Sequence, residues 1–178
     1  MIPELGQFCL VLALLMSLLQ AGVPLLARLN RPHALLHLTK PCAAAIFLLI
    51  TAAFFVLVYS YAVSDFSVLS VVTNSHTSKP MLYKIVGAWG NHEGSMLLWM
   101  WVLASCGFIV AFLKASDAQL KSATLSVLGL ISAGFLGFII FTSNPFLRVF
   151  PAPANGEDMN PILQDIGLAF HPPTLYVG

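Results

Sequence analysis

The sequence Trp89-Gly90-Asn91-His92-Glu93-Gly94-Ser95 leads into an apolar stretch, residues 94–113, that contains no Asp, Glu, Lys or Arg. About 20 apolar residues are enough for a helix to cross a hydrocarbon core of roughly 30 Å. A backbone in lipid must satisfy its own hydrogen bonds, so this stretch is predicted to be a transmembrane helix. Ionisable groups are costly at the rim of such a helix, and we therefore interpret His92 and Glu93 as functional candidates.

Three further stretches of similar length also lack charged residues, and together the four predict spans at about 5–27, 41–64, 94–113 and 122–141. The composition agrees, because 58% of the 178 residues are hydrophobic and only 8% are charged. The predicted fold class is an all-α integral membrane protein with four transmembrane helices. Membrane lipid is therefore an expected partner of these helices. A formal net charge of +1 without a basic cluster excludes nucleic acid as a partner.

The distribution of Lys and Arg predicts the orientation in the membrane. The short connections carry five basic residues: Arg28, Arg31, Lys40, Lys114 and Lys121. The two long segments, 65–93 and 142–178, carry only Lys79, Lys84 and Arg148. Both long segments and the amino terminus are therefore predicted to face outward. Glu4 lies where a signal peptide would be basic, so we interpret the first span as a retained anchor.

The connection before the third span contains a short helical pattern. Pro80 can begin a helix that places Met81, Leu82, Ile85, Val86 and Trp89 on one side. This stripe is equally consistent with an interfacial helix in the headgroup plane and with packing on the neighbouring spans. Asn91 is expected to cap the third span, with Glu93 complementing the helix dipole. That explanation leaves Trp89 and His92 without a role.

The tail holds six prolines in residues 142–178, which predicts a stiff and largely non-helical segment. Within it, His171 precedes Pro172 and Pro173, so we expect its imidazole on a rigid, exposed loop, as suits a metal ligand. The three cysteines, Cys9, Cys42 and Cys106, form no CxxC or CxxCH motif. The chain therefore carries neither a redox dithiol nor covalently attached haem of its own.

Several ordered motifs resemble one family, the CcmF/NrfE/CcsA haem lyases of cytochrome c maturation. They are WGNHEGS at 89–95, TSNPF at 142–146 and NPILQDIGLAFHPPTLY at 160–176, with the Met-x-Pro-Glu start and the DFSV at 65–68. The resemblance extends over the whole chain. It implies a haem lyase component of the bacterial inner membrane or the mitochondrial inner membrane.

The resemblance implies the chemistry as well. Such a protein takes haem b, as substrate or as a bound cofactor, from the periplasmic haem chaperone and works with other cytochrome c maturation proteins. It helps to join the haem vinyl groups to the CxxCH thiols of apocytochrome c through thioether bonds. By motif match, the resemblance implies that His171 is one of a pair of external axial ligands of the haem iron, and imidazole is a common ligand of this kind. Trp89, His92 and Glu93 are expected to shape the haem-facing surface rather than to bind iron.

The chain also departs from the family pattern. It has no WGxxWxWD-like tryptophan-rich loop, and the family's further haem-ligating histidines would lie beyond Gly178. We therefore expect a fragment, residues 1–178, that needs the remainder of the lyase to be competent. Two other functions stay open: a non-catalytic membrane scaffold, and a respiratory-complex subunit. The second is disfavoured because the four predicted spans carry no acid or lysine.

Overall fold

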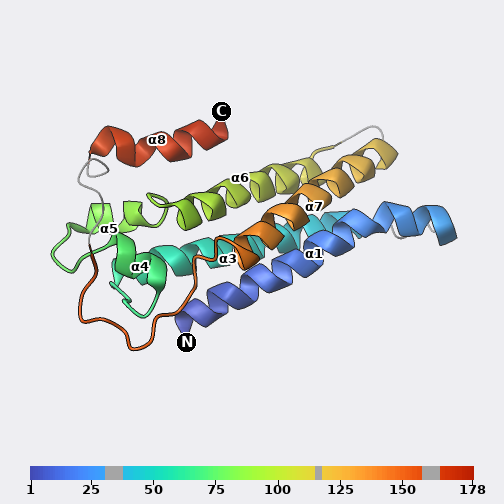
Figure 1. Cartoon of the computed structure of the whole chain (residues 1–178). Coiled ribbons are helices and arrows are strands. Elements are labelled where there is room, and N and C mark those ends of the chain that lie inside the picture. The colour runs from blue at the N-terminus through green and yellow to red at the C-terminus, as the bar shows by residue number, and fades with distance from the viewer. Residues whose placement is uncertain (31–37, 115–117, 158–164) are drawn as a thin grey trace.

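The computed structural model of the chain describes residues 1–30, 38–114, 118–157 and 165–178. Its helices, in chain order, are α1 (Ile2–Asn30), α3 (Thr39–Ala62), α4 (Leu69–Asn74), α5 (Met81–Gly87), α6 (His92–Phe112), α7 (Ala118–Phe141) and α8 (Ile166–Val177) (Figure 1). Four of them, α1, α3, α6 and α7, are long and apolar enough to cross a membrane. These four helices overlap the four predicted spans, and the all-α membrane fold class is confirmed. The loop residues 31–37 and the motif residues 160–164 lie outside the described part.

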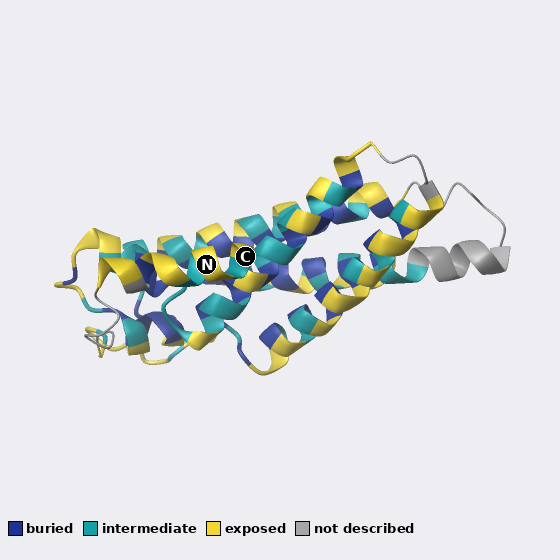
Figure 2. Cartoon of the chain, turned by 90° about the horizontal axis from the view of Figure 1, so that it is seen from above, coloured by how far each residue is buried: buried dark blue, intermediate teal, exposed yellow. Residues whose placement is uncertain are grey.

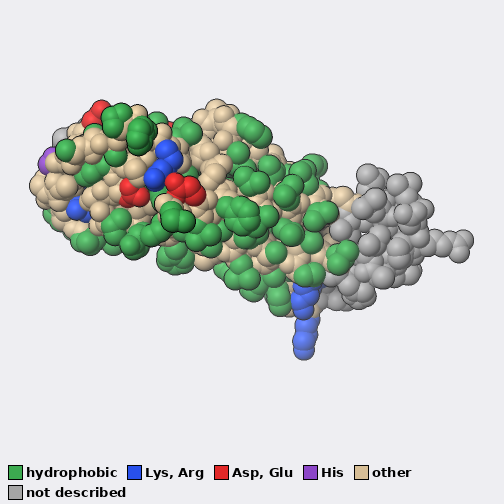
Figure 3. Space-filling model, turned by 90° about the horizontal axis from the view of Figure 1, so that it is seen from below, with side chains coloured by type: hydrophobic (Ala, Val, Ile, Leu, Met, Phe, Trp, Pro, Cys, Tyr) green, Lys and Arg blue, Asp and Glu red, His purple; other side chains and the backbone are tan. Residues whose placement is uncertain are grey.

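The four long helices form one bundle in which α1 contacts α3 and α7, and α6 contacts α3 and α7. Residues that face the neighbouring helices are buried (Figure 2), while large apolar side chains remain exposed on the outer surface (Figure 3). Gly129 lets α7 approach α1, because an added Cβ would lie only 2.9 Å from the Ala21 nitrogen. Beside it, Gln20 Nε2 donates to the Leu125 carbonyl at 2.6 Å. Such close contacts between small and polar residues are typical of helix packing in lipid.

The two long connections lie together at one end of the bundle, with the amino terminus (Figure 1). Residues 142–157 fold back along the connection after α3. The Leu69 amide donates to the Leu147 carbonyl at 2.8 Å, and the Glu157 amide donates to the Val72 carbonyl at 2.7 Å. Gly156 makes the second contact feasible, since an added Cβ would overlap the Ser75 carbonyl oxygen.

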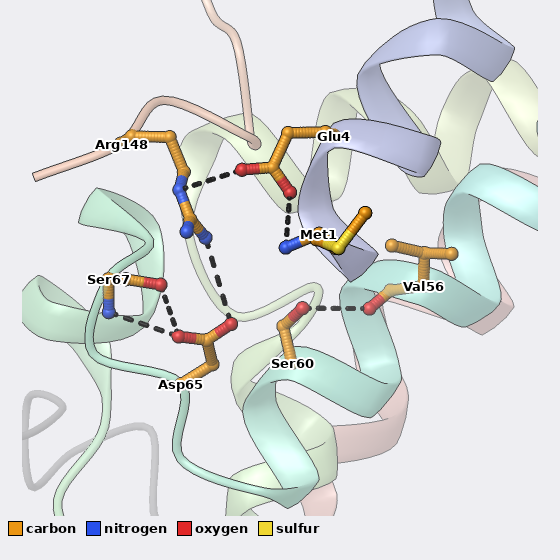
Figure 4. A network of polar contacts seen from close by, with 7 residues as sticks. All are labelled: Met1, Glu4, Val56, Ser60, Asp65, Ser67 and Arg148. Atoms are coloured by element: carbon orange, nitrogen blue, oxygen red, sulfur yellow. Dashed lines mark hydrogen bonds and ion pairs between the residues drawn. The ribbon is translucent and has the colours of Figure 1, made fainter.

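Arg148 joins three segments at this end (Figure 4). Its Nε lies 3.4 Å from a Glu4 carboxylate oxygen, and its Nη1 lies 3.8 Å from an Asp65 carboxylate oxygen. The ammonium group of Met1 pairs with the same Glu4 side chain at 2.7 Å. Charge thus links the tail to the start of α1 and to the connection after α3, and backbone hydrogen bonds strengthen the second of these links.

Short helix α5 begins after Pro80, as the sequence predicts. Val86 is buried, and α5 contacts α3, whereas Met81 and Leu82 are more than 40% exposed. The stripe therefore packs on the bundle at its carboxyl end and leaves its first turn uncovered. The packing alternative therefore describes the carboxyl end of this helix, and the placement of its first turn in the headgroup plane stays a prediction.

The prediction that the tail is non-helical is wrong for its last part. Helix α8 includes both Pro172 and Pro173 in its interior, and His171 lies on this helix rather than on a loop. The helix is held from outside: Ala169 is 1% exposed, and the Tyr176 ring stacks on Trp99 of α6 at 5.9 Å between centroids. Tertiary packing on α6 thus overrides the local preference of the proline pair.

Candidate functional site

Asn91 organises the corner at which α5 turns into α6. Its Oδ1 accepts a hydrogen bond from the Gly94 amide at 2.7 Å, so Asn91 is the N-cap of α6, as predicted. Its Nδ2 donates to the Gly87 carbonyl at 2.8 Å and to the Tyr61 hydroxyl at 2.7 Å. Tyr61 is fully buried and lies 2.6 Å from the Ser70 carbonyl oxygen. One amide side chain therefore connects the start of α6 to α3, α4 and α5.

Gly94 completes this corner because it leaves no room for a side chain. A Cβ at this position would overlap the carbonyl oxygen of Ala88. The glycine of the WGNHEGS motif is thus required by the close approach of two backbone segments, and this requirement fixes where α6 begins.

His92 lies on the first turn of α6 and is directed toward the end of α7. Its Nε2 lies 3.0 Å from the hydroxyl of Ser143, which is 3% exposed. Its ring meets Phe138 edge-on, with 6.4 Å between centroids. The imidazole is therefore held by a hydrogen bond to the neighbouring helix end, although its outer edge remains exposed.

Trp89 and His92 line the same cleft, which has a volume of about 260 Å³. One wall consists of the α5–α6 corner with Trp89, Asn91, His92 and Ser95, and the other is provided by Pro172 and Tyr176 of α8. The Trp89 ring stacks on Phe54 with 6.3 Å between centroids, which anchors it to α3. The lining combines aromatic faces with an imidazole, an amide and a hydroxyl group.

Glu93 is separated from that cleft. It lines a second cavity of about 120 Å³, together with residues of α4 and of the tail: Leu69, Ser70, Thr73, Thr142, Asn144 and Leu147. Consecutive residues of a helix point about 100° apart, so His92 and Glu93 serve different surfaces. The structure brings together Trp89 and His92 and places Glu93 on the other side of the corner.

His171 lies on α8 next to the cleft but does not line it. Ala169, Pro172 and Tyr176 are spaced so that they share the α6-facing side of α8, and His171 is rotated about 200° from Ala169. The imidazole is exposed accordingly. Within the described part of the chain its ring makes no hydrogen bond, and no group of three His, Cys, Asp or Glu side chains could hold a bare metal ion. A single free imidazole fits one axial position of an iron porphyrin.

The sequence did not point to Ser143 and Tyr176 as residues of this site. Both lie in motifs that carried the resemblance, TSNPF and HPPTLY, but only their spatial neighbours assign them roles. Ser143 binds His92, and Tyr176 closes the cleft while stacking on Trp99.

Comparisons with known proteins identify the relatives of this chain. Residues 89–178, half of the chain, match the family described as Cytochrome C assembly protein. The chain is 52% identical over its full length to the cytochrome c-type biogenesis protein ccl1 of Rhodobacter capsulatus. It is 44% identical to NrfE of Haemophilus influenzae and 42% identical to CcmF of Escherichia coli. It spans 27% of the length of the first of these relatives and 28% of the other two.

A solved structure described as the cytochrome c haem lyase CcmF has the same arrangement. The similarity covers 99% of this chain and 28% of that one, with a TM-score of 0.82 and 28% sequence identity. The match includes the α5–α6 corner and α8, since nearly the whole chain takes part. The chain belongs to the cytochrome c assembly protein family.

Proposed function

We propose that this chain is the amino-terminal, haem-handling part of a cytochrome c haem lyase, and that His171 ligates the iron of haem b. The observation that carries the proposal is the exposed imidazole of His171, which has no hydrogen-bond partner among the described residues, on a helix that is docked at both ends. The haem is the substrate, received from a haem chaperone. Its vinyl groups are joined by thioether bonds to the CxxCH thiols of apocytochrome c, with the remainder of the lyase taking part.

The site chemistry supports a ligand role for His171 and a different role for His92. His92 Nε2 is already occupied by Ser143, and the ring is packed against Phe138. His171 has no such partner in the described part of the chain. Trp89 and His92 form the wall on which α8 rests, so they shape the mouth of the haem-facing surface without contacting iron. Glu93 belongs to the same rim on its other side.

We place this end of the bundle on the periplasmic side of a bacterial inner membrane. The opposite end carries basic residues: Lys121 Nζ donates to the Leu113 carbonyl at 2.8 Å, and Lys40 Nζ lies 4.4 Å above the Phe112 ring. Lys and Arg favour the cytoplasmic side of short loops. The amino terminus, the two long connections and α8 then face the compartment in which c-type cytochromes receive haem.

A single substitution tests the proposal in the complete protein. His171→Ala is expected to abolish or strongly reduce holocytochrome c, measured by haem staining of the mature cytochrome. His76→Ala is the matched control, because His76 is a half-buried histidine at this end whose Nε2 lies 2.9 Å from Asn155 Nδ2. Holocytochrome c at the level of the His76→Ala control would remove His171 from the mechanism.

A further inference from the structure

Helix α8 contains a carbonyl group that its own helix cannot satisfy. In an α-helix the amide of residue i donates to the carbonyl of residue i−4. Position 173 is a proline, which has no amide hydrogen, and its ring crowds the carbonyl four residues earlier. The Ala169 carbonyl therefore lacks its intrahelical donor, although Ala169 is 1% exposed. A buried carbonyl without a donor is costly, so an outside donor is needed.

Trp89 supplies that donor. Its indole Nε1 donates to the Ala169 carbonyl at 2.9 Å, across 80 positions of sequence. The indole is itself fixed by stacking on Phe54 of α3. The donor thus comes from the rigid α5–α6 corner and not from a mobile side chain. At the other end of α8, Tyr176 stacks on Trp99 with an interplanar angle of 11°.

We infer that Trp89 is a positioning residue that locks α8 by capping the carbonyl that Pro173 leaves free. His171 lies between Ala169 and Pro173, so the same hydrogen bond fixes the direction of its imidazole. The WGNHEGS and HPPTLY motifs then act together. Pro173 leaves the Ala169 carbonyl without its helical donor, and Trp89 donates a hydrogen bond to that carbonyl. The role of His171 rests on the proposed function, whereas the lock itself does not.

A double-mutant cycle tests the lock without haem. Spin labels at Val177→Cys on α8 and Ile109→Cys on α6, both more than half exposed, report the docking of α8. The labels are placed in the complete protein in nanodiscs, with Cys9, Cys42 and Cys106 replaced by alanine. Trp89→Phe keeps an aromatic ring but removes the donor. It is expected to broaden the distance distribution at least twofold.

The rescue distinguishes hydrogen bonding from packing. Pro173→Ala restores an amide that donates to the Ala169 carbonyl, so Pro173→Ala alone and the pair Trp89→Phe with Pro173→Ala should both give a narrow distribution. Pro172→Ala is the matched control, because it restores a donor only for the carbonyl at position 168 and should not rescue Trp89→Phe. Trp99→Phe weakens the Tyr176 stack, and Pro173→Ala should not rescue it either.

A narrow distribution for Trp89→Phe alone would overturn the inference, as would a broad one for Pro173→Ala or for the double variant. Since no haem is present, the cycle measures docking only. If the cycle fails but holocytochrome c formation still depends on His171, the lock is rejected and the proposed function stands. If the cycle gives the expected result but holocytochrome c formation does not depend on His171, the lock stands and the proposed function is rejected.

Discussion

Replacing Asn91 with alanine should be among the most damaging polar substitutions in this chain. The change removes the N-cap of α6 and two donor bonds, one to the Gly87 carbonyl and one to the Tyr61 hydroxyl. Loss of an N-cap costs about 1 kcal/mol. Each of the other hydrogen bonds contributes about 1 kcal/mol net. The free energy of unfolding should therefore fall by about 3 kcal/mol.

The assay is unfolding of the purified protein in mixed micelles, followed by circular dichroism or tryptophan fluorescence. Asn91→Ser serves as the control, because a serine hydroxyl can still cap the Gly94 amide but cannot replace the two amide donors. It should lose about 2 kcal/mol, from those two bonds. A loss below about 0.5 kcal/mol for Asn91→Ala would refute the view that this side chain holds the corner together.

Three further predictions concern the surroundings of the site. Gly156→Ala should open the contact between the tail and α4, because the added Cβ would overlap the Ser75 carbonyl oxygen. The measurement is hydrogen exchange of the Glu157 amide, which donates to the Val72 carbonyl and should exchange faster in the variant. An unchanged exchange rate would contradict this prediction. Arg148→Ala should accelerate the same exchange less, since its ion pairs are solvent-exposed. His92→Ala should leave the axial-ligand absorption bands of the haem-loaded protein in place, because its imidazole is engaged with Ser143. A change in those bands would make His92 an iron ligand.

The four long helices could be predicted from the sequence because each is determined by the composition of its own segment. Each span is a run of about 20 uncharged residues, and the lipid environment allows such a run one backbone conformation. The cap of α6 was likewise predictable, since Asn91 immediately precedes the helix and its partner, Gly94, is three residues away.

Helix α8 could not be predicted in the same way. Two consecutive prolines argue against a helix locally, and the donor that compensates for one of them comes from Trp89, 80 residues earlier. The sequence motif also does not show that His92 and Glu93, which point about 100° apart, line different cavities. Only the helix geometry of the first turn of α6 separates the two side chains into different cavities.

The most direct test of the account is chemical rescue at position 171. The complete protein with His171→Gly, loaded with haem, should lose the absorption bands of an imidazole-ligated iron, and added free imidazole should restore them together with holocytochrome c formation. Bands that persist in His171→Gly without imidazole would contradict the assignment of this residue as the haem ligand.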